Sequence, residues 1–131
     1  MLRHRMKSDR GAAVVEFALV VPLLIVLVMG IAEFGRAFFI QATMAGAARE
    51  GARAMALADP ASAGPAAGTT AAQNALSPIT GPTFTPGPAC PASGATPANA
   101  TYTITWDMPS ITGMFGATFK LTGKGVMRCN G

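Results

Sequence analysis

A single glutamate interrupts a long apolar stretch near the start of the sequence. Glu16 stands between Gly11 and the uncharged run from Phe17 to Ala32. A carboxylate near the centre of a membrane helix costs about 2.5–3.5 kcal/mol on insertion scales, and such residues usually pair with a specific group. We therefore expect Glu16 to have a partner.

Proteolysis after Gly11 would create that partner. The cut frees an α-amine on Ala12 and makes Glu16 the fifth residue of the mature chain. Within one helix, the ammonium on Ala12 and the side chain of Glu16, four residues later, are poorly oriented to contact each other. The amine of one subunit can instead meet the glutamate of a neighbour during assembly. The spacing therefore predicts polymerisation.

The segment from Arg10 to Phe17 resembles a type IV prepilin processing site, in which a short basic leader ends in glycine and glutamate follows at the fifth mature position. The run continues as FALVVPLLIVLVMGIAEFGR, which resembles more narrowly the TadE family of the tight-adherence (Tad/Flp) pilus system. The tract AGAAREGARA extends this resemblance over the first 55 residues. A plain signal-anchor helix that begins with glycine and carries one glutamate is the alternative interpretation.

Positive charge is concentrated in the predicted leader, residues 1–11. Four Lys or Arg against Asp9 give this segment +3 of the total +4, so the rest of the chain carries +1. A pI of about 9.7 would suit nucleic acid, but this distribution argues against such a partner. Basic residues at one end of an apolar span hold that end in the cytoplasm. We therefore expect a cytoplasmic N-terminus and a periplasmic C-terminal part.

The apolar run is long enough to cross a bilayer. With residues 11–15 it gives about 20 residues, or about 30 Å of helix. An ordinary secretory signal peptide would have a shorter apolar core followed by small residues at a cleavage site. Gly30 and Ala32 keep that alternative open.

One helix is predicted over residues 12–57, with its first half in the membrane and its second half projecting, and with a kink at Pro22. Acid–base pairs three residues apart, Glu33 with Arg36 and Glu50 with Arg53, are expected on its more polar sides. A stripe at spacings of three and four is expected to cover a small core: Phe34, Phe38, Ala45, Ala48, Ala52 and Met55.

Small residues four apart on the same helix, Ala42 with Gly46 and Ala47 with Gly51, allow another helix to approach closely. Such a helix can belong to the protein's own domain or to another subunit. The sequence leaves both interpretations open.

Residues 58–100 are rich in Pro, Gly and Ala, and the prolines exclude long regular elements. A short helix from Thr69 to Leu76 and an extended piece from Ile79 to Phe84 are predicted there, within surface loop. Residues 101–131 should hold a β-hairpin. Thr101 to Asp107 alternates apolar and polar residues, which predicts a half-buried strand that ends at Pro109.

A second strand is predicted from about Ala117 to Cys129, with a bulge or bend at Gly123 and Gly125. Tyr102, Ile104 and Trp106 of the first strand should face the long helix, and the piece from residue 79 to residue 84 can join the hairpin. The predicted fold class is α+β, in which a long N-terminal helix packs on a small antiparallel sheet, as in pilins.

Cys90 and Cys129 both lie in the predicted exported part, where disulfides form and persist. We expect them to be bonded to each other, which would stabilise the fold by about 4 kcal/mol through loop closure. Two free thiols or a metal pair are the alternatives. A zinc site is poorly supported because no histidine lies nearby.

Catalytic chemistry is not indicated. The only histidine, His4, lies in the predicted leader, and no cluster has metal-ligand or cofactor-binding spacing. The tripeptide Gly123-Lys124-Gly125 lacks the Ser or Thr and the upstream Gly that a phosphate loop needs. Basic residues along the last strand (Lys120, Lys124 and Arg128) are interpreted as a solvated face that discourages edge pairing.

The resemblance implies a minor pilin or pseudopilin of the bacterial inner membrane, processed after Gly11 and assembled through Glu16 and Phe17. It implies as partners a prepilin peptidase, a Flp-type major pilin, other minor pilins and the inner-membrane assembly platform, and an extracellular pilus as a further location. Two alternatives remain. One is a signal-anchored envelope scaffold protein whose leader is never removed, and the other is a pseudopilin of a type II-like secretion system.

Overall fold

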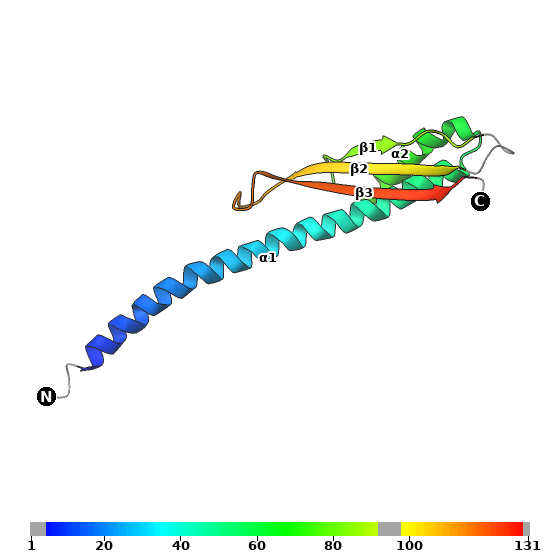
Figure 1. The fold of residues 1–131 in the computed structure, drawn as a ribbon. Helices are drawn as coiled ribbons and strands as arrows, with labels where there is room; N and C mark the ends of the chain where they lie inside the picture. The colour runs from blue at the N-terminus through cyan, green and yellow to red at the C-terminus, as the bar shows by residue number, and fades with distance from the viewer. Residues whose placement is uncertain (1–4, 92–97, 130–131) are drawn as a thin grey trace. The chain divides into compact units, whose positions relative to one another are not determined.

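The computed structural model describes residues 5–91 and 98–129, with side chains described from Arg10 onward. It contains two compact units, Met1–Gly35 and Arg36–Gly131, and we call the second the C-terminal domain. The elements are shown in Figure 1 and follow in this order: α1 (Arg5–Leu57), the short 3₁₀ helix η1 (Ala61–Ala63), α2 (Gly64–Leu76), β1 (Thr83–Pro86), β2 (Asn99–Pro109) and β3 (Thr118–Arg128).

Helix α1 ends at Leu57, as predicted, and begins at Arg5, within the predicted leader. It continues through Pro22 without interruption. Within the described part of the chain, α1 is the helix that is long and apolar enough to cross a membrane. The apolar side chains of its first half are exposed, with Leu19 at 74%. This exposure fits a helix whose natural surroundings are lipid.

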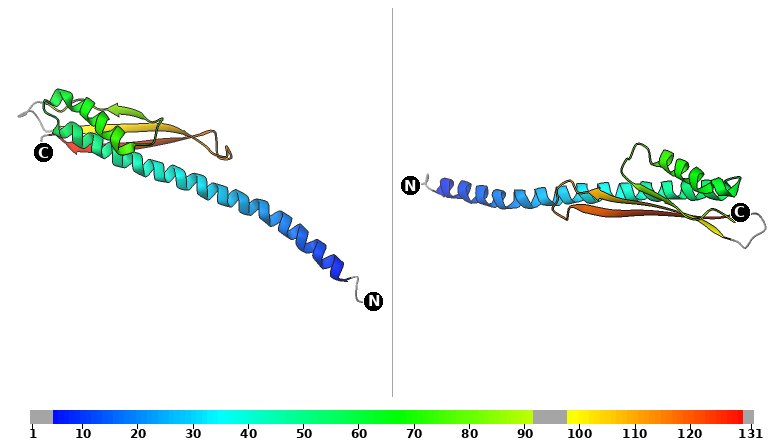
Figure 2. Two further views of the ribbon diagram at one scale, coloured as in Figure 1. Left: turned by 180° about the vertical axis from the view of Figure 1, so that it is seen from behind. Right: turned by 90° about the horizontal axis from the view of Figure 1, so that it is seen from above.

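The three strands form one antiparallel sheet in the order β1-β2-β3. Strand β2 begins two residues before the predicted Thr101 and ends at the predicted Pro109. The extended piece predicted from Ile79 to Phe84 is a strand from Thr83 to Pro86, which pairs with β2. Figure 2 shows the C-terminal end of α1 and the whole of α2 on the same side of this sheet. The α+β architecture is therefore confirmed.

The prediction of a bulge at Gly123 and Gly125 is wrong. Strands β2 and β3 pair one to one along their whole length, from Asn99 with Arg128 to Pro109 with Thr118. The two glycines are buried because α1 lies directly against them. A Cβ on Gly123 would meet the Met44 carbonyl carbon at 2.5 Å. A Cβ on Gly125 would collide with the Ala48 carbonyl oxygen. These glycines allow helix and sheet backbones to approach closely.

The face of α1 that packs on the sheet differs in part from the predicted stripe. Ala48, Ala52 and Met55 are fully buried as predicted, whereas Phe34 and Phe38 are 52% and 78% exposed. For Phe38 the reason is helical phase. Residues eleven apart lie close to three turns from each other, so Ala37 faces the same way as Ala48, while Phe38 points about 100° away.

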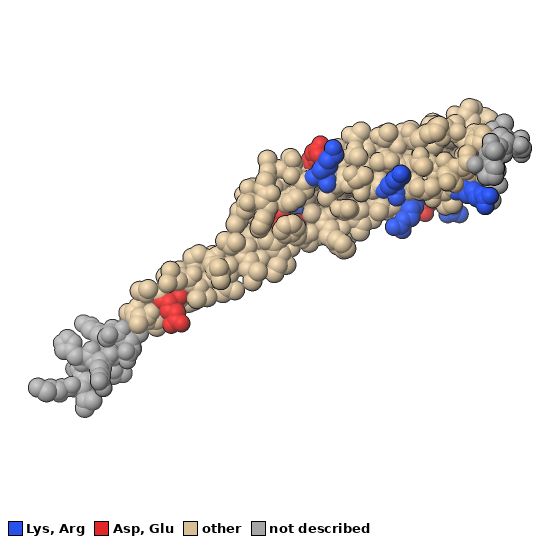
Figure 3. Space-filling model, in the orientation of Figure 1, with Lys and Arg blue, Asp and Glu red and all other residues tan. Residues whose placement is uncertain are grey.

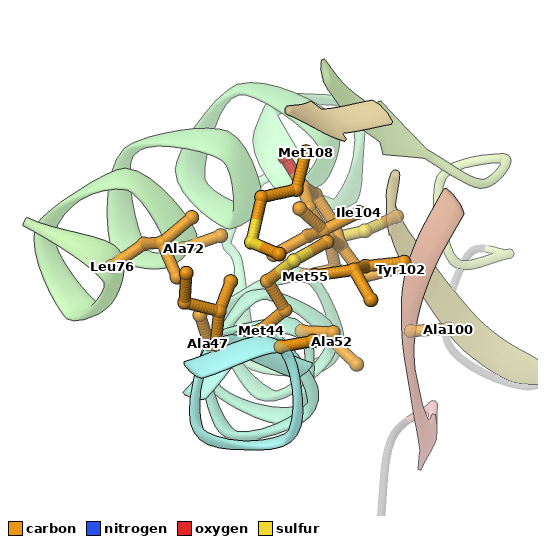
Figure 4. Close-up of a cluster of buried hydrophobic side chains, with 14 of the residues drawn as sticks. Met44, Ala47, Ala52, Met55, Ala72, Leu76, Ala100, Tyr102, Ile104 and Met108 are labelled. Atoms are coloured by element: carbon orange, nitrogen blue, oxygen red, sulfur yellow. The ribbon is translucent and has the colours of Figure 1, made fainter. Parts of the chain in front are cut away.

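The buried stripe of α1 continues through Ala37, Ile40 and Met44, which are small or flexible enough to pack closely against a sheet. Figure 4 shows Met44, Ala52 and Met55 of α1 meeting Tyr102, Ile104 and Met108 of β2. Glu33, which was expected on a polar side, is buried at 1% exposure. The exposed pair Glu50 and Arg53 is confirmed, at 4.0 Å.

Helix α2 begins five residues before the predicted Thr69. Pro65 lies in its first turn, where backbone N–H groups have no acceptor within the helix, so the N–H that proline lacks is not missed. Against α1, a Cβ on Gly68 would meet the Gly51 carbonyl oxygen at 2.9 Å. The close approach allowed by Ala47 and Gly51 therefore serves the protein's own domain. By contrast, a Cβ on Gly46 would have nothing within 4 Å.

Tyr102 joins the two layers. It is completely buried, and its hydroxyl donates a hydrogen bond to Thr69 Oγ1 of α2 at 2.9 Å. Burial raises the pKa of the Tyr102 hydroxyl above its ordinary value, and the hydrogen bond with Thr69 partly opposes that shift. A charged phenolate at this position would therefore be unfavourable.

Candidate processing and assembly segment

The predicted processing and assembly residues all lie on the first half of α1. Gly11, Ala12, Glu16 and Phe17 are helical and exposed, with Phe17 at 70%. A Cβ placed on Gly11 would have nothing within 4 Å. The segment is therefore sterically open to an enzyme or to a second subunit.

The bond between Gly11 and Ala12 lies six residues after the first helical residue, Arg5. A helix frays most easily in its first turns. Glycine also lowers helix stability by about 1 kcal/mol relative to alanine. Local opening of the chain at Gly11 is therefore inexpensive.

Glu16 follows Ala12 by one helical turn, or about 6 Å along the axis. Its side chain is exposed, and it forms no salt bridge within the part of the chain whose side chains are described. An amine freed on Ala12 would lie one turn from the carboxylate of its own chain and would be equally accessible to the carboxylate of a neighbour. In both cases the negative charge would also lie near a helix N-terminus, where the backbone dipole stabilises it.

The predicted disulfide is present in the C-terminal domain. Cys90 and Cys129 are bonded, with their Cα atoms 5.7 Å apart and a sequence separation of 39 residues. The Cys129 N–H also donates to the Ala98 carbonyl oxygen at 2.9 Å. The disulfide thus joins the end of β3 to the chain that leads into β2.

Charged side chains are distributed unevenly. Figure 3 shows Lys and Arg side chains over the C-terminal domain. Lys120, Lys124 and Arg128 alternate on the exposed face of β3, which is an edge strand of the sheet. This position matches the prediction of a solvated face. Within the described residues, no group of three or more His, Cys, Asp and Glu is placed to hold a metal ion.

The model of one protein family, described as TadE-like protein, matches residues 11–53. This chain carries a TadE-like segment. The match begins at Gly11 and includes Ala12, Glu16 and Phe17. It ends within α1, before α2 and the sheet. No curated protein and no solved structure matches the chain.

The TadE-like match and the apolar helix α1, which is the one candidate span among the described residues, together fit a membrane-anchored pilin. They support membership of a pilus system that contains other pilins. The sheet, the disulfide and α2 lie outside the matched residues, so their description rests on the structure alone.

Two features were not anticipated from the sequence. The loop between β2 and β3 exposes large apolar side chains, among them Ile111 at 59%. A surface hollow of about 340 Å³ lies beside Trp106, between Thr83 of β1 and Lys120 of β3. The exposed apolar side chains of the loop could have been predicted from its uncharged sequence. The hollow could not, because it depends on strand pairing that no local pattern encodes.

Proposed function

We propose that this chain is a TadE-like minor pilin or pseudopilin of a tight-adherence pilus, made as an inner-membrane precursor and matured by a prepilin peptidase after Gly11. The observation that carries the proposal is the coincidence of two features. The TadE-like match begins at Gly11, and Glu16 lies five residues later as an exposed carboxylate in the stretch of α1 from residue 11 to residue 32, which is otherwise uncharged. In this proposal the chain is a substrate of an enzyme and not an enzyme itself.

Charge arithmetic supports the role of Glu16. An exposed carboxylate on a helix in lipid costs about 2.5–3.5 kcal/mol, which is a factor of roughly 100 in a partition equilibrium. An α-amine on Ala12 reduces that cost only once the leader is removed. Processing therefore gives the Glu16 carboxylate a positively charged partner, the α-amine on Ala12. This ion pair can form between two subunits.

The C-terminal domain supports a minor rather than a major subunit. It contains a three-stranded sheet, a second helix and a disulfide in addition to α1. Major Flp pilins consist of little more than a helix that corresponds to α1. The partners in this proposal are the peptidase, the Flp-type major pilin, other minor pilins and the assembly platform. The N-terminus is cytoplasmic and the domain periplasmic, because basic residues precede the span.

The test compares two single substitutions in a strain that lacks the native copy. Glu16→Ala is expected to leave processing largely intact but to weaken incorporation into pili. Glu50→Ala is the control, since its side chain is exposed and pairs only weakly with Arg53. The readouts are the mass of the membrane-bound protein and the amount of the protein in sheared pili. Normal piliation by Glu16→Ala would refute the assembly role.

A further inference from the structure

The hollow of about 340 Å³ in the C-terminal domain lies beside the first residue of β1. Figure 1 shows that β1 covers only part of β2. Their pairing begins with Thr83 opposite Thr105, so residues 106–109 of β2 have no paired strand on that side within the described chain, and the hollow lies at this step. Small-molecule sites have volumes of about 300–1,000 Å³, so the hollow is large enough for a small ligand. Its lining residues are Gly81, Thr83, Thr105, Trp106, Asp107 and Lys120.

The main chain of Asp107 is open toward the β1 side of β2. On that side, the Gly87 N–H donates to the Thr101 carbonyl oxygen at 2.8 Å. On the β3 side, the Ser110 N–H donates to the Ala117 carbonyl oxygen at 3.0 Å. The backbone groups of successive residues alternate between the two sides of a strand, so the odd-numbered residues of β2, Asp107 among them, face the β1 side. Within the described residues no hydrogen bond engages the Asp107 N–H or carbonyl, so both groups are available to a ligand.

Four polar side chains lie near these backbone groups on the outer face of the sheet. Thr83 pairs with Thr105, and Asp107 pairs with Lys120. Paired residues share a face of the sheet, as do residues two apart on one strand, so the four side chains lie together. This face is opposite the one that packs on α1, because the buried side chains of β2 belong to even-numbered residues. Within the described residues, no ion pair joins Asp107 to Lys120 and neither threonine hydroxyl forms a hydrogen bond.

The indole of Trp106 adds an apolar surface and one more hydrogen-bond donor. A Cβ on Gly81 would lie 2.8 Å from Trp106 Nε1, so the main chain at Gly81 lies against the edge of the indole. Gly81 has φ of +110°, which glycine adopts readily. Every buried side-chain nitrogen and oxygen in the described residues has a hydrogen-bond partner, and Trp106 Nε1 has none. The indole N–H is therefore open to solvent.

The groups that line the hollow favour a neutral ligand that carries several hydroxyl groups. One carboxylate and one ammonium give the hollow no net charge, so an anion would meet Asp107 and a cation would meet Lys120. A hydroxyl group both donates and accepts hydrogen bonds. Neighbouring hydroxyls on a sugar ring can therefore donate to the carboxylate and accept from the ammonium, and hydrogen bonds to charged groups are the stronger ones. The C–H groups of the same ring can pack on the Trp106 indole.

We propose that this hollow binds one or two rings of a neutral saccharide. The Asp107 carboxylate accepts hydrogen bonds from ring hydroxyls, the Lys120 ammonium donates to them, and the Trp106 indole packs on the apolar side of a ring. The Asp107 N–H and carbonyl add a second donor and a second acceptor, which a hydroxyl or a bridging water satisfies. The inference rests on the C-terminal domain alone and depends on neither processing nor a pilus.

A peptide is the other ligand that an open strand edge commonly binds, by adding a strand to the sheet. The open edge is too short for that here. The next residue that faces this side, Pro109, has no N–H, and its carbonyl oxygen already accepts from Arg36 Nη1 at 3.3 Å. In the other direction, Thr105 is already paired with Thr83 of β1. Asp107 therefore offers one donor and one acceptor, which suit a hydroxyl group but not a strand.

Nuclear magnetic resonance of the full chain tests the proposal. Trp106 is the only tryptophan in the sequence, so its indole N–H gives a single signal that reports directly on the hollow. The chain is held in dodecylphosphocholine micelles, because a detergent with a sugar headgroup would compete for the site. The probes are neutral disaccharides (maltose, cellobiose and N,N′-diacetylchitobiose), with alanyl-alanine as a peptide and sodium sulfate as an anion.

We expect at least one disaccharide to shift the Trp106 signal saturably, and neither alanyl-alanine nor sulfate to do so. Asp107→Ala and Lys120→Ala should each raise the dissociation constant about tenfold or more, because each removes a charged hydrogen-bonding group. Lys124→Ala is the matched control, since Lys124 is an exposed lysine on the same face of β3 and does not line the hollow. Its dissociation constant should equal that of the native chain.

The proposal is overturned if none of the disaccharides gives a saturable shift, or if Asp107→Ala and Lys120→Ala bind as tightly as the native chain. A shift with alanyl-alanine alone would identify a peptide ligand instead, and a shift with sulfate alone would identify an anion site. Either result would also overturn the proposal. Both replaced side chains are exposed, so the variants should fold as the native chain does, which near-ultraviolet circular dichroism checks.

Discussion

Replacing Gly123 by alanine tests the packing of α1 on the sheet. The added Cβ would lie 2.5 Å from the Met44 carbonyl carbon, 2.6 Å from its oxygen and 2.7 Å from the Ala45 nitrogen. Ordinary contacts begin at 3.4 Å, so the two backbones must separate by about 1 Å. All three obstructing atoms belong to the main chain. A change of side-chain rotamer therefore gives no relief.

The expected cost follows from this displacement. A gap of about 0.5–1 Å forfeits a quarter to a half of the dispersion energy of the atoms along it, and overpacked cores lose about 1–3 kcal/mol. Alanine recovers about 0.5–1 kcal/mol because glycine is the weaker residue in a strand. The difference between these two terms is an expected loss of about 1 kcal/mol in the free energy of unfolding of Gly123→Ala. For a domain of this size the melting temperature should fall by about 4–8 °C.

The assay is thermal unfolding of the full chain in detergent, followed by near-ultraviolet circular dichroism of Tyr102 and Trp106. Gly46→Ala is the control because a Cβ there meets nothing within 4 Å. This helical replacement should raise stability by about 1 kcal/mol. If Gly123→Ala melts at or above the temperature of Gly46→Ala, the account of these glycines as sites of close backbone approach is incorrect.

Two further predictions concern the core and the disulfide. Reduction of the bond between Cys90 and Cys129, or replacement of both by serine, should lower the free energy of unfolding by about 4 kcal/mol in denaturant titrations, and an unchanged midpoint would contradict this. Because the folded-state pKa of Tyr102 is raised, its stabilising contribution is complete below pH of about 10 and is lost as pH rises through the folded value. Tyr102→Phe should therefore show a shallower alkaline loss of stability than the native chain, and identical slopes would refute the assignment.

The elements that local patterns encode were predicted well. Helix α1 ends at Leu57 because the run of helix formers stops shortly before Pro60, and β2 follows the alternation that begins at Thr101. The disulfide was predicted because the sequence has only two cysteines, both in the part that was expected to be exported. The roles of Gly11 and Glu16 were predicted from spacing and charge, which need no tertiary information, and they stay a prediction.

The predictions that were wrong, the buried face of α1 and the bulge in β3, concern features that depend on contacts between residues distant in the sequence. Alanine, glycine and methionine occur all around the second half of α1, so its buried face is chosen by the strands that pack on it. Gly123 and Gly125 fit a bulge and a close approach equally well, and only the position of Met44 and Ala48 decides between them. The exposure of Phe38 follows from the same choice of face.

The mature N-terminus is the most direct test of the proposed function. Intact-mass analysis and N-terminal sequencing would be done on membrane protein from cells with and without the prepilin peptidase. The account predicts a chain that begins at Ala12 when the peptidase is present and at the original N-terminus when it is absent. A native chain that still begins at Met1 or Leu2, or a mass indifferent to the peptidase, would contradict it.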